Sequence, residues 1–303
     1  MGMKILITGA AGFVANALVE SILRDSYMEW SLILCDQAFP AQIPLENVNY
    51  QNCDITDYSS LKELFSEHNF DAVVHLAAVL SKGETNESAR LIERVNIAGT
   101  MNMALLSSEF HAKLIFFSTG LVYGNDKKCP FGEEMPCAPA GYYALSKYIG
   151  EEIIRHQNLT ASMSYTIFRP SVIYGPEQHG SMFIPSLMAS AVKGEPYAMT
   201  KGEQTRDFVY IDDVVSALRL SIAKPLSGTF NLSCNFSASI ASIADLVAKW
   251  SGSVMNKGAI PYRNHETWDY RLDNAKLVSQ GWNPQISLEK GLRKCFETYK
   301  KGV

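Results

Sequence analysis

The first half of the chain alternates short apolar runs with amphipathic stretches. The runs are apolar on both faces, as the central strands of a parallel sheet are, and they occupy residues 4–8, 32–35, 72–76 and 114–118. Stretches with helical periodicity lie between and after them, near residues 13–25, 57–69, 88–110 and 143–157. Strands that alternate with helices predict βαβ units, and therefore a parallel sheet with right-handed crossovers.

The pattern becomes less regular in the second half. Further elements are predicted there: a strand at 164–169 that ends at Pro170, helices at 209–223, 239–251 and 287–300, and a strand at 228–232. We therefore expect an α/β fold with a Rossmann-type, doubly wound parallel sheet over residues 1–170, which binds the cofactor. Segments at about 207–232 are expected to return to it. A smaller, discontinuous C-terminal lobe over 171–303 is expected mainly to bind substrate.

Composition limits the possible functions. The 303-residue chain has a formal net charge of −4, so it has no basic excess that would attract nucleic acid or an anionic membrane. No apolar run approaches about 18 residues and the N-terminal segment lacks signal-peptide features, so we expect no membrane span and a cytoplasmic location. The six cysteines include no C-x-x-C pair, which predicts reduced thiols and no metal site.

A glycine-rich turn, T-G-A-A-G-F-V-A at 8–15, separates the first predicted strand from the first helix. Such a turn lets the backbone approach a pyrophosphate, whose charge then meets the N–H groups of the helix N-terminus; a purely structural turn is the alternative. Asp36 ends the second strand 24 residues after Gly12, where a carboxylate can bind the adenosine ribose hydroxyls. Alone, Asp36 would be read as a solvated loop residue. Because its charge would repel a 2′-phosphate, the sequence favours NAD over NADP.

Tyr143 and Lys147 are four residues apart at the start of a predicted helix and therefore share one face. A phenol of pKa ~10 needs its pKa lowered by roughly 3 units to act as a base near neutrality, which an ammonium and an oxidised nicotinamide can supply together. The Tyr-x-x-x-Lys spacing occurs four times in the chain, so the spacing alone is not specific. Tyr143 stands out because it follows Thr119, at a strand end, by 24 residues. The Thr119 hydroxyl can bond a substrate oxygen or merely cap the strand.

These residues resemble the extended short-chain dehydrogenase/reductase family, and in particular its NAD-dependent epimerase/dehydratase branch, which acts on nucleotide sugars. The resemblance covers nearly the whole chain. Besides the glycine-rich turn, its motifs are N-C-D-I at 52–55, H-L-A-A at 75–78, V-N-I-A-G-T at 95–100, S-T-G-L-V-Y-G at 118–124, Y-Y-A-L-S-K at 142–147, F-R-P-S-V-I-Y-G-P at 168–176, R-D-F-V-Y-I-D-D at 206–213 and G-W-N-P at 281–284.

The resemblance implies roles for particular residues. Tyr143 would be the acid/base, Lys147 would bond the nicotinamide ribose, and Thr119 would orient the reacting oxygen of the substrate. The implied cofactor-binding residues are Gly9, Gly12, Phe13, Val14, Asp36, Asp54, Ile55, Leu76, Ala77, Ala78, Asn96, Tyr143, Lys147 and Pro170. His75 is read as structural, because it belongs to a strand packed within the sheet.

The substrate side departs from the family pattern at two places. Arg206 falls where the family binds the nucleotide diphosphate, and Arg263 resembles a second such arginine; a surface ion pair is the alternative for both. Val172 stands where many members have a substrate-binding Asn. The family's 4,6-dehydratases follow the catalytic Thr with an Asp-Glu pair, whereas this chain has Gly120 and Leu121, which disfavours a dehydratase.

Two reactions fit best: 4-epimerisation of a nucleotide-diphosphate sugar, or reduction of a 4-keto sugar. The alternatives are a dehydrogenase of a small hydroxy acid or amino alcohol and, from another class, a non-catalytic NAD-binding sensor. Members of the family commonly dimerise through the Tyr–Lys helix and the helix before it, so a homodimer is expected. Leu145, Ile149 and Ile153 fit either that interface or packing on the sheet. The loop at 79–86 is not interpretable from the sequence.

Overall fold

The computed structural model describes residues 2–25, 29–39, 47–80, 83–125, 129–178, 180–263 and 266–302. The chain forms two compact units. The first comprises Met1–Gly124, Pro136–Arg169 and Val215–Phe230, and the second comprises Asn125–Met135, Pro170–Val214 and Asn231–Val303. A later stretch of the chain, Val215–Phe230, returns to the first unit. The segment 125–135 belongs to the second unit, which nothing in the sequence pattern indicates.

A seven-stranded sheet forms the centre of the first unit, in the order β10-β6-β5-β4-β1-β2-β3. The strands are β1 (Lys4–Thr8), β2 (Ser31–Asp36), β3 (Val48–Asn52), β4 (Ala72–His75), β5 (Lys113–Phe117), β6 (Tyr165–Pro170) and β10 (Gly228–Leu232). The pairings from β6 through to β3 are parallel. The chain order reverses between β1 and β4, which is the switch point at which open α/β sheets bind ligands.

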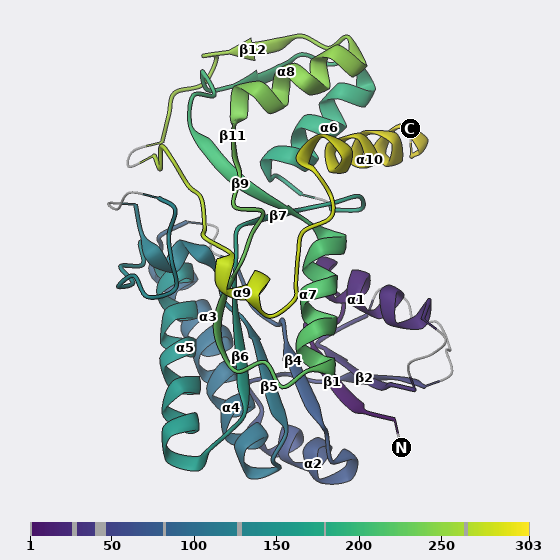
Figure 1. Ribbon diagram of the computed structural model, residues 1–303, viewed down its shortest axis with the longest axis vertical. Helices are drawn as coiled ribbons and strands as arrows, with labels where there is room; N and C mark the ends of the chain where they lie inside the picture. Colours follow the sequence, from purple (N-terminus) through teal and green to yellow (C-terminus); the bar gives the residue numbers. More distant parts are fainter. Residues whose placement is uncertain are drawn as a thin grey trace. The chain divides into compact units, whose positions relative to one another are not determined.

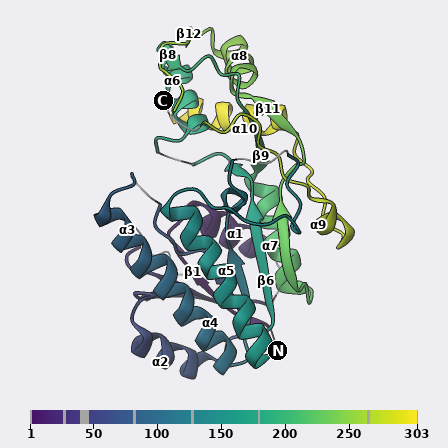
Figure 2. The ribbon, with the colours of Figure 1, turned by 90° about the vertical axis from the view of Figure 1, so that its left-hand side faces the viewer.

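Helices cover both faces of this sheet, so it is doubly wound (Figure 1). On one face lie α1 (Phe13–Leu23) and α7 (Ile211–Ala223); on the other lie α2 (Tyr58–His68), α3 (Asn86–Ile92), α4 (Gly99–Glu109) and α5 (Tyr142–Ala161) (Figure 2). A π-helix, η1 (Glu93–Ala98), joins α3 to α4, and a 3-10 turn, η2 (Gly120–Tyr123), follows β5. The predicted fold class is confirmed.

A hydrophobic core of the first unit lies between the sheet and α2, α4 and α5. The strands bury apolar side chains on this face because both of their faces are covered by helices. Its members include Leu6, Ile33, Val73, Leu114, Phe116 and Ile167 from the strands, and Leu61, Phe65, Met103, Leu106 and Ile154 from the helices. This packing holds α5, which carries Tyr143 and Lys147, against the carboxyl half of β5.

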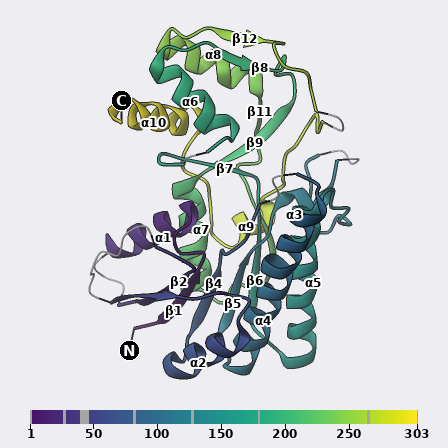
Figure 3. The same ribbon diagram turned by 180° about the vertical axis from the view of Figure 1, so that it is seen from behind.

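The second unit combines small sheets with helices (Figure 3). One sheet has the order β11 (Ser237–Ser239), β9 (Thr205–Tyr210), β7 (Val172–Tyr174), and the other pairs β12 (Met255–Lys257) with β8 (Tyr197–Met199). The helices are α6 (Phe183–Lys193), α8 (Ile240–Ser251) and α10 (Leu288–Lys301), with a short α9 (Ala275–Ser279). Strand β9 is parallel to β7 and antiparallel to β11, and it carries Arg206.

One prediction about the cysteines is wrong. Cys35, at the end of β2, and Cys53, just after β3, form a pair with their Cα atoms 5.7 Å apart, a separation typical of disulfides. The expectation of reduced thiols is therefore contradicted for these two. Of the described helices, none is both long and apolar enough to cross a membrane.

Candidate active site

The glycine-rich turn brings the end of β1 into contact with the segment after β4. Gly9 has a φ of +68°, and a Cβ there would lie 2.6 Å from the backbone nitrogen of Ala77. Gly12 is the N-cap of α1, with extended backbone and no side-chain cap, so the N–H groups of Phe13 and Val14 at the helix start are left for a ligand. A close backbone turn followed by an uncapped helix N-terminus fits a pyrophosphate.

Asp36 connects this turn to the end of β2. Its carboxylate accepts hydrogen bonds from the backbone N–H of Ala11 (3.0 Å) and of Gln37 (2.7 Å). The side chain of Gln37 donates in turn to Asp54 at 3.2 Å. The pKa of Asp54 is lowered, mainly by the hydrogen bond from the backbone N–H of Thr56, so the Asp54 carboxylate is ionised near neutrality.

A further cofactor candidate, Ile55, is placed by helix packing. Ile55 is buried, and a Cβ on Gly99 would lie 2.5 Å from its Cδ1, so the first residue of α4 must be small for Ile55 to keep its position. Its carbonyl oxygen accepts a hydrogen bond from Asn102. Leu76, Ala77 and Ala78, which follow β4, are all partly exposed, as residues that contact a ligand should be.

His75 belongs to a buried chain of hydrogen bonds. Thr100 donates its hydroxyl proton to the carbonyl oxygen of Asn96 (2.6 Å), so it must accept from Nε2–H of His75 (3.1 Å). Nδ1 of His75 is therefore the unprotonated nitrogen, and it accepts from the Thr8 hydroxyl at 2.7 Å. Burial, together with the charge of Lys147, lowers the pKa of His75 to about 3, so the ring is neutral.

Asn96 connects the segment after β4 to α5. Its Oδ1 accepts from the backbone N–H of Val79 (2.8 Å), and its Nδ2 donates to the Val79 carbonyl (3.0 Å) and to Oγ of Ser146 (3.0 Å). Ser146 donates in turn to the carbonyl oxygen of Tyr143 at 2.8 Å. Asn96 lies in the π-helix η1, a distortion that is frequent at functional sites.

The three proposed catalytic residues all belong to the first unit. Lys147 is 2% exposed, and its ammonium lies 4.8 Å from the ring centroid of Phe116 in β5. Burial lowers the pKa of Lys147 to about 7 and raises the pKa of Tyr143 to about 12. Thr119 caps η2, where its Oγ1 accepts from the backbone N–H of Leu121, so its own hydroxyl proton remains available to a substrate.

The candidates for substrate and remaining cofactor contacts lie in the second unit. Pro170 ends β6, and Val172 starts β7. Arg206 is partly buried on β9; it donates to the carbonyl oxygens of Thr205 and Thr267 and forms an ion pair with Glu266. Arg263 is exposed. The ion-pair alternative considered for Arg206 is thus present in the structure, and its partner Glu266 was not foreseen from the sequence.

The buried residue that sequence reasoning missed in the first unit is Glu151. It lies four residues after Lys147 and eight after Tyr143, on the same face of α5. That face packs on the sheet, so a carboxylate at this spacing must have buried partners. The spacing was the signal that could have identified it.

Comparison with known proteins places this geometry in a family. The sequence model described as "NAD dependent epimerase/dehydratase family" matches residues 5–233. A putative UDP-glucose 4-epimerase from Methanocaldococcus jannaschii is 29% identical, with 98% of each chain covered. A dTDP-D-glucose 4,6-dehydratase from Mus musculus is also 29% identical, over 98% of this chain and 89% of the relative. The crystal structure of a UDP-glucose 4-epimerase from Thermotoga maritima with UDP-glucose superimposes with a TM-score of 0.89, at 27% identity and 99% coverage of both chains.

We expect Gly9→Ala to weaken NAD binding by about tenfold or more, because the new Cβ meets the Ala77 backbone at a positive φ, a strain of about 1–3 kcal/mol. Isothermal titration calorimetry with NAD measures the change. Gly194→Ala is the matched control: Gly194 has a φ of +69°, has open space around its Cβ position and lies in the second unit. Wild-type affinity in Gly9→Ala would refute the assignment of the turn.

The neutral His75 predicts a particular acid sensitivity. Its pKa is about 3 in the folded protein and 6.5 ordinarily, so the unfolded chain binds more protons between these values and stability falls as the pH falls through this window. The slope is at most about 1.4 kcal/mol per pH unit. Urea unfolding from about pH 7 to pH 5 should show a shallower fall in His75→Gln than in the wild type. His156→Gln, at an exposed position of α5, should keep the wild-type slope; equal slopes in all three proteins would contradict the prediction.

Proposed function

The chain belongs to the NAD dependent epimerase/dehydratase family and is therefore an NAD-dependent enzyme, and we propose that its reaction is the 4-epimerisation of a nucleotide-diphosphate sugar. The observation that carries this choice is the pair of residues after Thr119. Gly120 has no side chain, and Leu121, an apolar residue, is 48% exposed. Elimination of water from the sugar needs an acid and a base beside the reacting carbon. These two positions provide neither, which supports chemistry at C4 alone.

The residues of the first unit suit proton and hydride transfer at one carbon. Bound NAD supplies the hydride acceptor and donor for C4. Tyr143 accepts the proton of the 4-hydroxyl at its phenol oxygen and later returns it, while Thr119 donates its free hydroxyl proton to the same sugar oxygen. Lys147 bonds the nicotinamide ribose and stabilises the ionised phenol. The proposed cofactor contacts of the first unit are Gly9, Gly12, Phe13, Val14, Asp36, Asp54, Ile55, Leu76, Ala77, Ala78 and Asn96, and Pro170 of the second unit joins them.

The second unit supplies the proposed contacts to the nucleotide part of the substrate. A guanidinium bonds phosphate oxygens through two parallel N–H groups and keeps its charge at all physiological pH values. These properties suit Arg206 to a diphosphate. In the same way they suit Arg263, which is exposed and lies outside the strands. Val172 adds an apolar contact. Since NAD and nucleotide sugars are both cytoplasmic metabolites, we infer a cytoplasmic location.

We also propose that the enzyme is a homodimer. Helix α4 buries Met103 and Leu106 against the sheet, yet Met101 and Leu105 on its outer side are 38% and 37% exposed, and Leu145 on the neighbouring α5 is 42% exposed. A helix that is apolar on all sides is usually buried on all sides. A second copy of the same two helices, in a four-helix arrangement, would cover this apolar surface.

The reaction is tested by incubating the protein with UDP-, dTDP-, GDP- and CDP-sugars and following the C4 configuration by NMR. We expect interconversion of the two C4 epimers without net NADH formation. Tyr143→Phe should lower kcat by about 10²- to 10⁴-fold, the usual contribution of an acid/base group. Tyr142→Phe removes the hydroxyl of a tyrosine that is 36% exposed at the adjacent position of α5, and it should leave kcat unchanged.

Three results would contradict the proposed reaction. A 4-keto-6-deoxy product would indicate a dehydratase, and consumption of NADH in proportion to product would indicate a 4-keto reductase. Turnover of a small hydroxy acid or amino alcohol, with none of the nucleotide sugars, would indicate a small-substrate dehydrogenase. Full activity in Tyr143→Phe would remove Tyr143 from its assigned role.

The dimer is tested by sedimentation equilibrium. Leu105→Glu places a charge in the centre of the apolar surface of α4, so we expect it to convert the dimer to monomer, because an unpaired charge is costly to bury. Leu23→Glu is the matched control, since Leu23 is 40% exposed on α1, which covers the opposite face of the sheet. A monomeric wild type, or a dimeric Leu105→Glu protein, would refute this interface.

A further inference from the structure

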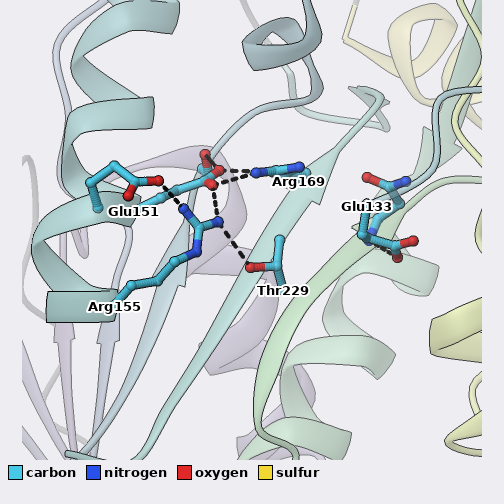
Figure 4. Close-up of polar contacts among 8 residues, drawn as sticks. Glu133, Glu151, Arg155, Arg169 and Thr229 are labelled. Atoms are coloured by element: carbon cyan, nitrogen blue, oxygen red, sulfur yellow. Dashed lines mark hydrogen bonds and ion pairs between the residues drawn. The ribbon is translucent and has the colours of Figure 1, made fainter. Parts of the chain in front are cut away.

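A single carboxylate on α5 collects hydrogen bonds from three elements of the first unit (Figure 4). Glu151 is fully buried, and its Oε1 accepts from Oγ–H of Ser118 (2.5 Å) and from Nε–H of Arg169 (2.9 Å). Its Oε2 accepts from Nη2 of Arg169 and from Nη2 of Arg155, both at 2.6 Å. Arg155 extends the cluster to Glu152 and Thr229.

Each donor lies directly beside a residue of the proposed active site or on its helix. Ser118 precedes Thr119 at the end of β5, and Arg169 precedes Pro170 at the end of β6. Glu151 itself follows Tyr143 and Lys147 at successive turns on one face of α5. The carboxylate therefore joins the strand end that carries Thr119 to the helix that carries the proposed base.

We propose that Glu151 and Ser118 are positioning residues, whose hydrogen bond holds Thr119 at the correct place relative to Tyr143 and Lys147. The inference rests on the proposed function, since it assigns Thr119 and Tyr143 to one substrate oxygen. Both groups must then come within about 2.6–3.2 Å of that oxygen at the same time. Displacements of about 1 Å are known to reduce rates about 100-fold.

The negative charge of Glu151 is balanced by the two arginines without Ser118. The two arginines already give Glu151 three charge-assisted hydrogen bonds, and replacing buried ion pairs by apolar residues is often neutral for stability. The Ser118 hydroxyl is a neutral fourth donor, also buried, that ties β5 to the carboxylate. Its removal leaves the ion pairs intact and breaks only the side-chain link between the strand end and α5, while the Ser118 N–H keeps its hydrogen bond to the Phe168 carbonyl (2.8 Å).

Ser118→Ala isolates this bond. We expect kcat on the nucleotide sugar to fall about 10- to 100-fold, while KM and the Kd for NAD stay within about twofold of wild type, because both binding surfaces are kept. Ser107→Ala is the matched control: Ser107 is a fully buried serine of α4 whose Oγ has no hydrogen-bond partner among the described residues. The two variants should melt at similar temperatures, but only Ser118→Ala should lose kcat.

A double-mutant cycle with Glu151→Gln identifies the pair. If the two side chains act through one bond, the double variant loses no more kcat than the more damaged single variant, whereas independent effects multiply. Multiplied losses, or the kcat of Ser118→Ala equal to that of Ser107→Ala, would overturn the proposal. Should Glu151→Gln fail to fold, the serine variants decide the question by themselves.

Crystal structures of the wild type and Ser118→Ala provide a readout that needs no substrate. The Oγ1 of Thr119 should move relative to the phenol oxygen of Tyr143, and an unchanged separation would refute the positioning role. A wild type that turns over no nucleotide sugar would instead refute the proposed function. The two failures are therefore distinguishable.

Discussion

The burial of the Lys147 ammonium is the constraint on which the proposed chemistry of the first unit depends. Taking an ammonium out of water is unfavourable, and its pKa of about 7 shows that only part of this loss is recovered, through contacts such as the Phe116 ring face. The same desolvation raises the pKa of Tyr143 to about 12. The protein by itself thus favours a neutral phenol. A further positive charge is needed to make it a base, and the oxidised nicotinamide carries one.

Because the pKa of Tyr143 depends on the nicotinamide charge, the proton transfer and the hydride transfer are coupled in the proposed reaction. Tyr143 releases its proton easily only while a cation lies beside it, and it holds that proton when the charge is gone. The phenol is therefore a base at the stage at which a hydride is to be accepted from the sugar, and an acid at the stage at which it is to be returned. An epimerase requires this alternation within a single turnover, and burial of the site makes it strong because charges interact more strongly away from water.

The surroundings of these groups are held by hydrogen bonds that leave little freedom. The chain from Thr8 through His75 and Thr100 to Asn96 connects β1, β4 and the π-helix, and Asn96 continues it to Val79 and to Ser146 beside Lys147. Every polar group in that chain has a partner, which is the condition under which a buried network stabilises one arrangement. His75, read from the sequence as structural, occupies its centre.

The sequence predicted those parts of the fold that depend on local pattern. The central strands were readable because they are apolar on both faces, whereas β3 escaped detection because Asn49, Gln51 and Asn52 give an edge strand a polar sequence. Strand β9 was read as the beginning of a helix, since its apolar end runs directly into α7. The π-helix has no residue signature of its own. The sequence therefore predicted one continuous helix at 88–110, where the structure has α3, the π-helix and α4 in succession.

The contacts that the sequence could not give are those set by distance in space. Gly9, Tyr143 and Lys147 follow from spacing because each belongs to a strand–turn–helix motif, and Asp36 follows from its place at the end of the second strand. The pairs Cys35–Cys53 and Arg206–Glu266 depend instead on strand register and on a loop that returns across 60 residues. The second pair bears on substrate binding in its own unit. If Arg206 binds the diphosphate as proposed, the diphosphate would meet a guanidinium already paired with Glu266, so its affinity would depend on displacing that carboxylate and not on the arginine charge alone.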